Sequence, residues 1–503
     1  MTDIVSQVVI VGGGSSAWLA AAGLRRAFGK RGIDVAVLDT GIALNAPLVH
    51  WTLPSQRAMH ALLGVQEAEL LRRTDATFKL GAEHRGWQGA DSCFLHAHGD
   101  LGTELAGGTP FYKYLLMQAI AGKAESPEPY SVAALAARHG RFARPMGGEQ
   151  ELTSSFTYGF HLDEIAYAAF LRDHALRLGV RRLAGPLAGV EHLEGGAIRA
   201  LRLEGGETLG GELFVDCSGS DALLMNRFST AREAWSSWLP ADRLMITRAP
   251  AMADPPALTR TFATDAGWMW HVPQARSSLV GYVYSSQFIR DDAAFTELSG
   301  VAPGLQASPR ITTFSAGRRR SFWEHNCVAL GQAAMQLEPL AGAELHFAQL
   351  GLGTLIELFP LRTPNAIEGA EYNRVMAEQA DALRDFTVAH YRVGSPRSGA
   401  FWTAARALSP PDRLAQRLDL FCASGRLNMM DFETFEEVDW AWLLLGARVT
   451  PQAMELQIRS QLEKIDPQRI AALRTQVERL AASMPRHGDY LLRSSGQGSH
   501  ARH

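Results

Sequence analysis

The chain has 503 residues, of which 47% are apolar and 20% charged, and its formal net charge is −3. This is the composition of a globular protein with room for two or three units, each with a core of its own. A nearly neutral charge gives no reason to expect nucleic acid or an anionic membrane as a partner. Because no apolar run reaches about 18 residues and the N-terminus lacks the basic start of a signal peptide, we expect no membrane span and a cytoplasmic location.

The cysteines and the densest run of positive charge are interpreted as structural features. The four cysteines are scattered, without a CxxC pair or metal-ligand spacing, so we expect no metal site. Three of them adjoin apolar residues, which predicts buried thiols in a reducing compartment. The run Arg318-Arg319-Arg320 is expected to lie on a solvated face.

The first forty residues carry the pattern of a βαβ unit. A β-branched run at Val8–Val11 enters a glycine turn, and an Ala- and Leu-rich helical pattern follows over Ala17–Phe28. A second apolar run, Ile33–Leu38, ends in Asp39. The order strand, glycine turn, helix, strand and terminal acid predicts a dinucleotide-binding βαβ unit.

The glycine turn itself has the spacing of a dinucleotide fingerprint, with Gly12, Gly14 and Ala17 at the three small positions. The first glycine permits the tight turn, and the second lets a pyrophosphate approach the backbone at the N-terminus of the helix. Asp39, 22 residues beyond Ala17, is placed to accept hydrogen bonds from ribose hydroxyls. An acid there disfavours a ribose 2′-phosphate, so FAD or NAD is expected rather than NADP, and this unit does not choose between the two.

Downstream, helical and strand-like patterns alternate. A helical stretch at Asp163–Leu178 precedes short strand-like pieces through Leu213–Val215, and residues from about Val375 to Leu480 read as mostly helical. The pattern predicts a split nucleotide-binding domain, an inserted substrate-covering domain and helices that close the end of the chain. The tail, Ser494–His503, is expected to be frayed.

Two motifs resemble the flavin-dependent tryptophan halogenases. The opening run Val9–Trp18 is similar to the start of that family, which usually has glycine where Ala17 stands. The segment Gly267–Pro273 is similar to the family's WxWxIP signature, with Trp268 and Trp270 as its tryptophans, Val272 in place of Ile, and Pro273 at its end.

Further segments extend the resemblance from near the first residue to about residue 450. They are Phe78–Gly81, which resembles the family's lysine loop, with Trp87 and Asp91-Ser92 downstream; His161–Asp163 and Phe170–Arg172; Val215–Gly219, which contains Asp216; Asn326–Gly331; Leu337–Leu340; and Trp440, six residues before Gly446.

The resemblance implies an α/β fold with an FAD-binding Rossmann-like domain of the glutathione reductase and hydroxylase type. It implies that residues 1–45, 150–235 and 310–355 form the split FAD-binding domain, with an inserted substrate and tunnel region at 46–149 and 236–309. A helical substrate-binding cap would follow at 356–493. Gly12, Gly14, Ala17, Asp39, Asp216 and Gly331 would then contact or shape the site of FAD.

In that family, FADH2 delivered by a separate flavin reductase, oxygen and a halide such as chloride or bromide yield hypohalous acid. The acid travels through a tunnel to a lysine that holds it against an aromatic substrate. Lys79 would be this lysine. Trp268, Trp270 and Pro273 would shape the tunnel, and His96 and Trp440 would face a small aromatic or peptide-borne substrate. The chain could assemble as a homodimer.

The chain departs from the family directly after Pro339-Leu340. The family places a glutamate there, which helps to polarise the substrate or the lysine-bound halogen, and then Ser-Thr-Gly, whose backbone helps to bind halide. Here Ala341 stands at the glutamate position and Glu344 at the glycine position. This leaves two alternatives. In the first, Glu344 or Glu338 supplies the missing carboxylate from a neighbouring position. In the second, halide binding is lost, because a carboxylate near the halide pocket repels the anion. Equally, Glu344 is a hydrogen-bonded acid at a helix start.

Three hypotheses follow. The first is a two-component flavin-dependent halogenase that acts on an electron-rich aromatic such as an indole, with Lys79 and Glu344 as the catalytic candidates. The second is an FAD-dependent monooxygenase or oxidase on the same scaffold that no longer uses halide, which the altered segment at Ala341 favours. The third is a non-enzymatic flavoprotein, which Lys79 and the paired tryptophans argue against. His96, His98 and His346 are either substrate-facing or structural, hydrogen-bonded histidines.

Overall fold

The structure is a computed structural model that describes residues 5–43, 48–147, 151–305, 308–360, 366–395 and 397–494. The chain divides into two compact units. Unit 1 comprises Met1–Ala76, Leu162–Ser236 and Thr312–Asp381, and unit 2 comprises Thr77–His161, Ser237–Ile311 and Ala382–His503.

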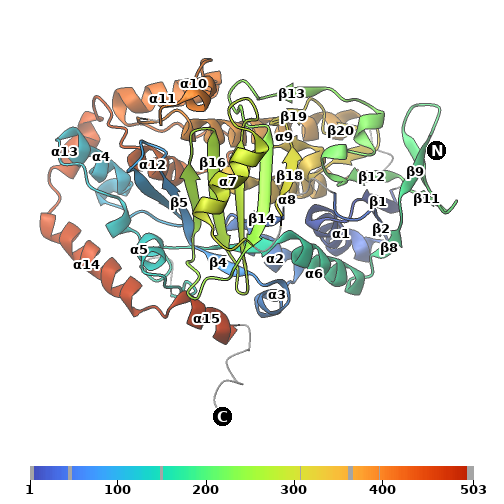
Figure 1. The fold of residues 1–503 in the computed structure, drawn as a ribbon, viewed down its shortest axis with the longest axis horizontal. Coiled ribbons are helices and arrows are strands. Elements are labelled where there is room, and N and C mark those ends of the chain that lie inside the picture. The colour runs from blue at the N-terminus through green and yellow to red at the C-terminus, as the bar shows by residue number, and fades with distance from the viewer. Residues whose placement is uncertain are drawn as a thin grey trace, which may run out of the picture. The chain divides into compact units, whose positions relative to one another are not determined.

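The central sheet of unit 1 has the strand order β20-β21-β12-β1-β2-β8 (Figure 1). Its first strand, β1 (Gln7–Val11), pairs in parallel with β2 (Asp34–Asp39) on one side and with β12 (Leu213–Asp216) on the other. Since the carboxyl ends of parallel strands meet at one edge of a sheet, the glycine turn lies beside Asp39 and Asp216. The predicted βαβ unit is confirmed.

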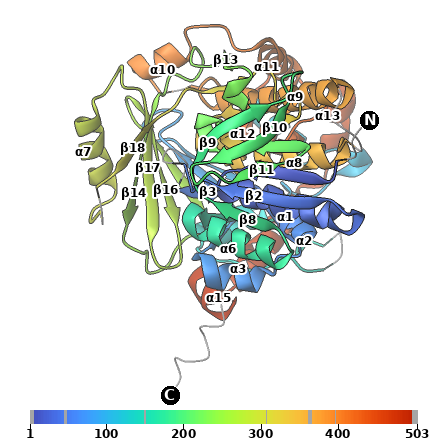
Figure 2. The same cartoon turned by 90° about the vertical axis from the view of Figure 1, so that its right-hand side faces the viewer.

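Helix α1 (Ser15–Phe28) packs on β1 and β2, and helices α6 (Glu164–Arg177) and α8 (Ala343–Glu357) pack against α1 (Figure 2). The Asp163 carboxylate caps α6 by accepting the N–H of Ala166 at 2.9 Å, which explains why the helix begins where the sequence predicts. Gly23 permits close packing of α1 on α8, because a Cβ there would lie 2.7 Å from Leu352 Cδ2.

The remaining elements of unit 1 are β3 (Val49–Trp51), α2 (Ser55–Leu63), α3 (Glu67–Thr74), β8 (Arg181–Ala184), β9 (Leu187–His192), β10 (Ile198–Leu203), β11 (Thr208–Gly210), β13 (Arg232–Ala234), β19 (Gly317–Arg319), β20 (Trp323–Glu324), β21 (Cys327–Ala329) and β22 (Met335–Gln336). Three elements contain residues of both units: β7 (Gly159–Asp163), β18 (Arg310–Thr313) and α9 (Ala366–His390).

Unit 2 is built on a mainly antiparallel sheet in the order β18-β14-β17-β16-β15-β5-β6. Its strands, β18 apart, are β5 (Gly81–Arg85), β6 (Cys93–Ala97), β14 (Arg243–Ala249), β15 (Thr259–Ala263), β16 (Gly267–Pro273) and β17 (Ser278–Tyr284). A short strand, β4 (Thr77–Lys79), pairs with β7 so that Lys79 lies opposite Gly159.

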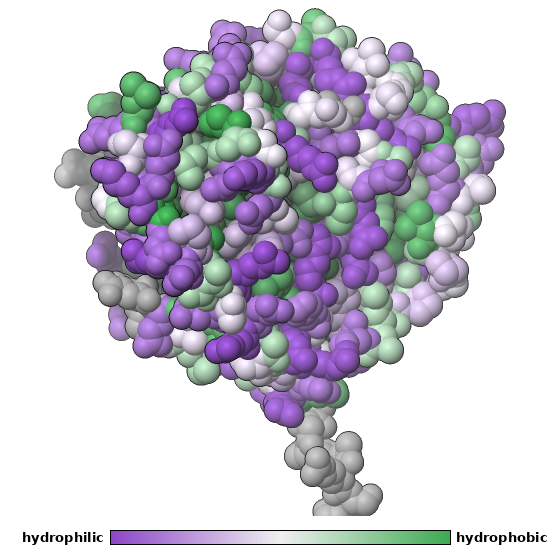
Figure 3. All heavy atoms as spheres, turned by 90° about the vertical axis from the view of Figure 1, so that its left-hand side faces the viewer, coloured by the Kyte–Doolittle hydropathy of each residue, from purple (hydrophilic) through white to green (hydrophobic). Residues whose placement is uncertain are grey.

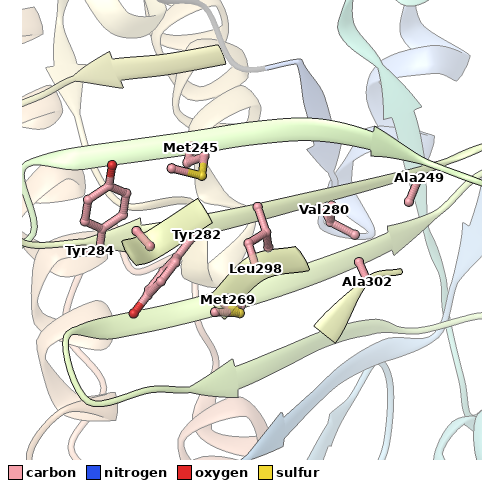
Figure 4. Packing of buried hydrophobic residues seen from close by; sticks show 9 residues of the cluster. Met245, Ala249, Met269, Val280, Tyr282, Tyr284, Leu298 and Ala302 are labelled. Atoms are coloured by element: carbon pink, nitrogen blue, oxygen red, sulfur yellow. The ribbon is translucent and has the colours of Figure 1, made fainter. Parts of the chain in front are cut away.

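One face of this sheet is covered by α7 (Asp291–Val301), as Figure 4 shows for the buried cluster between them. Met269 of β16 and Tyr282 of β17 point into the cluster with Leu298 of the helix. Because successive side chains of a strand point to opposite faces, Trp268 and Trp270 lie on the other face of β16.

The helical end of the chain is confirmed. It contains α10 (Ala400–Ala405), α11 (Asp412–Ser424), α12 (Glu437–Gly446), α13 (Leu456–Leu462), α14 (Pro467–Ser483) and α15 (His487–Ser494). Two further helices of unit 2, α4 (Tyr112–Ile120) and α5 (Val132–Arg138), come earlier in the chain. Hydrophobic residues on the face in Figure 3 are scattered among hydrophilic ones, as on ordinary protein surfaces. Among the described helices, none combines the length and apolar character that crossing a bilayer requires.

Two expectations about single residues are wrong in part. Cys217 and Cys327 are buried, but Cys93 and Cys422 are exposed, because an apolar neighbour in sequence does not decide which way a side chain points. Arg319 is also buried, although a solvated face was predicted for its run. Its guanidinium donates to the carbonyls of Ala333 and Ser229, both at 2.7 Å, so the charge is hydrogen-bonded inside unit 1. The predicted frayed tail lies outside the described residues except for Ser494.

Candidate functional site

The glycine turn of unit 1 leaves no room for side chains. Gly12 has φ +139°, and a Cβ on it would lie 2.3 Å from the carbonyl oxygen of Cys217. A Cβ on Gly13 would lie 2.4 Å from Asp39 Oδ1, and one on Gly14 would lie 2.9 Å from Glu164 Oε1. The turn therefore has the close approach between backbone and surroundings that a pyrophosphate-binding loop needs.

An anionic oxygen already lies at the N-terminus of α1. The Glu164 carboxylate accepts the N–H of Ser15, the first residue of the helix, at 2.8 Å through Oε1. Its Oε2 lies 2.7 Å from Nε2 of His50, and both side chains are buried. Burial works to lower the pKa of His50, but the hydrogen bond and charge of Glu164 outweigh it and raise this pKa. The helix end thus provides the electrostatic conditions for an anion.

Glu344 lines the same pocket as Gly14, His50 and Glu164. It lies in the first turn of α8 and accepts a hydrogen bond from Gln332 Nε2 at 2.5 Å. Burial raises the pKa of its carboxyl, and the nearby Glu164 acts in the same direction, while His50 and Gln332 oppose the shift. Glu344 is therefore a hydrogen-bonded acid at a helix start, on the wall of the pocket that contains the glycine turn.

The other predicted cofactor residues surround this turn, and they differ in the hydrogen bonds that their side chains already make. Asp39 accepts the N–H of Gly41 at 3.0 Å and pairs with Arg182 at 2.8 Å. Asp216 is buried, and its carboxylate accepts backbone N–H groups of Ser218, Leu224 and Met225. Its contacts therefore organise the loop after β12. Ala17 is buried in α1, and Gly331, with φ +62°, lines the pocket.

The residues present fit a dinucleotide such as FAD. The glycine turn is a cradle that added Cβ atoms would fill, the end of α1 holds an anionic oxygen, and Asp39 ends the second strand. A phosphate at the helix N-terminus would compete with the Glu164 carboxylate for the N–H of Ser15.

Lys79 in unit 2 is a buried amine at the end of β4, with 2% of its surface exposed. Its Nζ lies 3.0 Å from Nε2 of His98. Burial lowers the pKa of Lys79 to about 7, and the carboxylate of Asp439 opposes the shift. Near neutral pH the side chain therefore has comparable populations of ammonium and amine, both with chemical uses.

His96 and Trp440 lie in the same part of unit 2. His96 Nε2 is 2.8 Å from Oδ1 of Asp439 on α12. Trp440, the next residue of the helix, is buried, packs edge-on against Phe386 at 5.0 Å between ring centroids, and has the guanidinium of Arg417 4.4 Å from its ring centroid. Sequence reasoning missed Asp439, although its place beside Trp440 was a usable signal.

The paired tryptophans are core residues of β16. Trp268 is fully buried and lies 5.9 Å from Trp87 between ring centroids. The indole of Trp270 lies over Gly281 of β17, where a Cβ would come within 2.3 Å of the ring. Pro273 ends the strand, and its carbonyl accepts the hydroxyl of Thr77 at 2.8 Å. This contact ties the end of the tryptophan strand to β4, which carries Lys79.

His346 and Glu338, the remaining candidates from the sequence, lie in unit 1. His346 Nδ1 lies 2.8 Å from the hydroxyl of Ser55, and burial lowers the pKa of His346 to about 4, which indicates a neutral, structural histidine. Glu338 is buried in unit 1. Lys79 belongs to unit 2, and Glu344 to unit 1.

Unit 2 also contains a cavity of about 650 Å³, a size typical of small-molecule sites. The first turn of α12 and the segment after His98 contribute to its walls. The lining side chains include the aromatic rings of Phe111 and Tyr112 and five acids, namely Asp100, Glu104, Glu151, Glu436 and Glu437. No lysine or arginine is among the described lining residues. Sequence reasoning missed this cavity, because its acids lie on segments more than 280 residues apart.

Comparisons with known proteins agree with this architecture. The family model described as tryptophan halogenase matches residues 7–461. Tryptophan 7-halogenase RebH of Lentzea aerocolonigenes is 28% identical over 454 residues, which cover 85% of this chain and 84% of that protein.

Two solved structures are similar over almost the whole chain. BrvH, a flavin-dependent halogenase from Brevundimonas sp. BAL3, has a TM-score of 0.91 and 31% identity, covering 97% of this chain and 99% of that one. A flavin-dependent halogenase from Xanthomonas campestris has a TM-score of 0.90 and 33% identity, with 98% of each chain covered. The α/β fold with a helical C-terminal region is confirmed, and the chain belongs to the tryptophan halogenase family of flavin-dependent halogenases.

Proposed function

We propose that this enzyme uses FADH2, oxygen and a halide to halogenate an electron-rich aromatic substrate of the indole class, and that Lys79 transfers the halogen. The observation that carries the proposal is the state of Lys79, a buried amine with a pKa of about 7 beside His98. The tryptophan halogenases among the relatives support an indole substrate.

Lys79 serves this chemistry in either protonation state. The ammonium donates a hydrogen bond to hypohalous acid, and the free amine exchanges a proton for halogen, which gives a haloamine and water. In both cases the oxidant is confined at one point, and positioning of this kind supplies a large part of catalysis. Because burial removes competing water, the Lys79 amine is a selective acceptor.

The flavin would be held by the glycine turn, the end of α1 and Asp39, and when bound as FADH2 it would supply the reducing equivalents for oxygen activation. Glu164 is the group that the pyrophosphate would displace from Ser15, and His50 would then remain as a partner for that carboxylate. The sequence shows no second nucleotide-binding turn for NAD(P)H, so we propose a separate flavin reductase as partner.

The cavity beside α12 is the proposed substrate site. It begins at Asp100, two residues after His98, and ends on the helix that carries Asp439 and Trp440. Its aromatic walls suit a planar ring, and its acids favour a substrate that carries a protonated amine. Tryptamine-like substrates are therefore expected to bind more tightly than indole carboxylates.

A halide-independent monooxygenase is the second candidate, because Glu344 places a carboxylate at the position where the family binds halide through backbone. Burial raises the pKa of Glu344, which reduces the negative charge that its carboxyl presents to chloride or bromide at a given pH, so this residue is compatible with a halogenase.

The deciding experiment supplies FADH2, oxygen and bromide to the enzyme with an indole panel and follows products by mass spectrometry. Bromine isotope pairs in the product support the halogenase, and products that gain only oxygen support the monooxygenase. The Lys79→Ala variant should lose halogenation by about two to four orders of magnitude while it still consumes oxygen. Full halogenation by that variant would refute the role of Lys79.

A further inference from the structure

Lys79 and His98 form a buried pair in which the proposed function assigns a chemical role to Lys79 alone. The Nζ of Lys79 lies 3.0 Å from Nε2 of His98, and the two side chains are 2% and 7% exposed. Both belong to unit 2, and the two backbones are joined where His98 donates its N–H to the carbonyl of Leu80 at 2.8 Å. A side-chain contact and a backbone hydrogen bond therefore both keep the two residues together.

His98 is suited to accept a hydrogen bond from Lys79 rather than to take the proton from it. Burial lowers the pKa of His98 well below its usual value, and the charges of Lys79, His96 and His161 act in the same direction. The neutral imidazole has one nitrogen with a free lone pair, which accepts a hydrogen bond from the Lys79 ammonium. An ammonium has three N–H groups, so the bond to His98 restricts rotation about the Cε–Nζ bond and sets the direction of the other two N–H groups.

The neighbouring titratable groups have hydrogen-bond partners of their own. His96 is engaged with Asp439, and His161 lies within hydrogen-bond distance of the hydroxyls of Thr77 and Thr259, at 2.9 and 3.0 Å. His84 has Lys79 among the charges that lower its pKa, and its Nδ1 lies 3.0 Å from Thr261 Oγ1. Asp439 is the acid whose charge raises the pKa of Lys79.

We infer that His98 is a positioning residue for Lys79: its imidazole accepts a hydrogen bond from the ammonium and thereby fixes the direction in which the amine meets the halogen donor. The inference rests on the proposed function of Lys79. It extends that function to a second residue, which sets the orientation and the working pH range of the first.

The test replaces His98 with two side chains. The His98→Phe variant keeps an aromatic ring but removes the acceptor, whereas the His98→Gln variant retains an acceptor in its side-chain oxygen. We expect His98→Phe to lower kcat on the order of 100-fold, as a small misplacement of a reacting group does, with KM for the aromatic substrate nearly unchanged. His98→Gln should recover most of the lost kcat. The His139→Phe variant, made at an exposed histidine, is the matched control and should behave as wild type.

A second readout does not depend on activity. The contribution of Lys79 to stability is the difference in unfolding free energy between a protein with Lys79 and its Lys79→Met counterpart, measured by denaturant from pH 5 to 10. In the wild-type background this difference should begin to change near pH 7, where Lys79 titrates. Loss of the acceptor disfavours the ammonium, so the onset should move to lower pH in His98→Phe and stay near 7 in His98→Gln.

The outcomes separate the two proposals. An unchanged onset and an unchanged kcat in His98→Phe would show that His98 does not position Lys79, whatever Lys79 does. A shifted onset in an enzyme that never incorporates halogen would leave the pair established and overturn the proposed function. If the kcat of His98→Gln is as low as that of His98→Phe, and its onset shifts equally, the hydrogen bond is not the property that matters and the inference is wrong.

Discussion

The carboxylate of Glu164 accepts the N–H of Ser15 at the start of α1, at a distance of 2.8 Å. Glu164 is the first residue of α6, so the acid reaches the glycine turn from a neighbouring helix. It occupies the kind of position that a phosphate oxygen takes in dinucleotide-binding proteins, where free N–H groups and the helix dipole attract negative charge. A pyrophosphate bound at this helix end would therefore compete with the Glu164 carboxylate for the N–H of Ser15.

The Gly14→Val variant should lose FAD binding. Even a Cβ at this position would lie 2.9 Å from Glu164 Oε1, and a valine side chain would fill the space that the pyrophosphate needs. Binding is measured by flavin fluorescence quenching, with folding checked by circular dichroism. Gly195→Val is the matched control, because a Cβ at Gly195 meets nothing within 4 Å. A folded Gly14→Val protein with wild-type affinity would remove the turn from the flavin site.

The Lys79→Met variant should be more stable than wild type near neutral pH. A lysine whose pKa falls from 10.5 to about 7 on folding binds fewer protons in the native state, so wild-type stability should rise as pH increases from about 7 to 10.5. Each unit of such a shift corresponds to about 1.4 kcal/mol, so the gain for Lys79→Met is a few kcal/mol below pH 7. It should shrink through that pH window. A gain that is independent of pH between 6 and 10 would contradict the assigned pKa.

The Glu344→Gln variant should lower the KM for halide. The glutamine side chain keeps hydrogen-bonding capacity beside Gln332 but has no charge, so it removes repulsion of chloride or bromide. In wild type the halide KM should increase as pH rises and Glu344 ionises, whereas in the variant this dependence should be weaker. Steady-state bromination at several bromide concentrations and pH values measures both effects. If KM and its pH dependence are the same in both proteins, Glu344 does not face the halide.

The Glu437→Gln variant should weaken binding of an amine-bearing indole more than binding of neutral indole. Glu437 lines the cavity and accepts the hydroxyl of Tyr112, so the change removes charge and leaves a side chain of similar size. Loss of one partially exposed charge interaction should raise KM for tryptamine about 2- to 5-fold, which corresponds to roughly 0.5–1 kcal/mol. Equal effects on both substrates would argue against recognition of the amine there.

Local sequence was sufficient for the elements that follow from short-range physics. The glycine turn, Asp39 and strand β1 could be predicted from the sequence, because the conformational freedom of glycine and a run of apolar residues are properties of a few neighbouring residues. The start of α6 was readable for the same reason, since Asp163 caps it from the adjacent position. The family motifs added the predicted roles of Lys79 and the paired tryptophans.

Tertiary structure alone decided which side chains share an environment. Lys79 and His98 are 19 residues apart, and His96 and Asp439 are 343 apart, so no local pattern indicated either contact. The same holds for Glu164, which meets Ser15 across 149 residues, and for Arg319, whose charge is buried by carbonyls from other segments. The burial and the pKa of a side chain depend on every group packed around it. Those groups come from the whole folded chain and not only from the residues next to it in sequence.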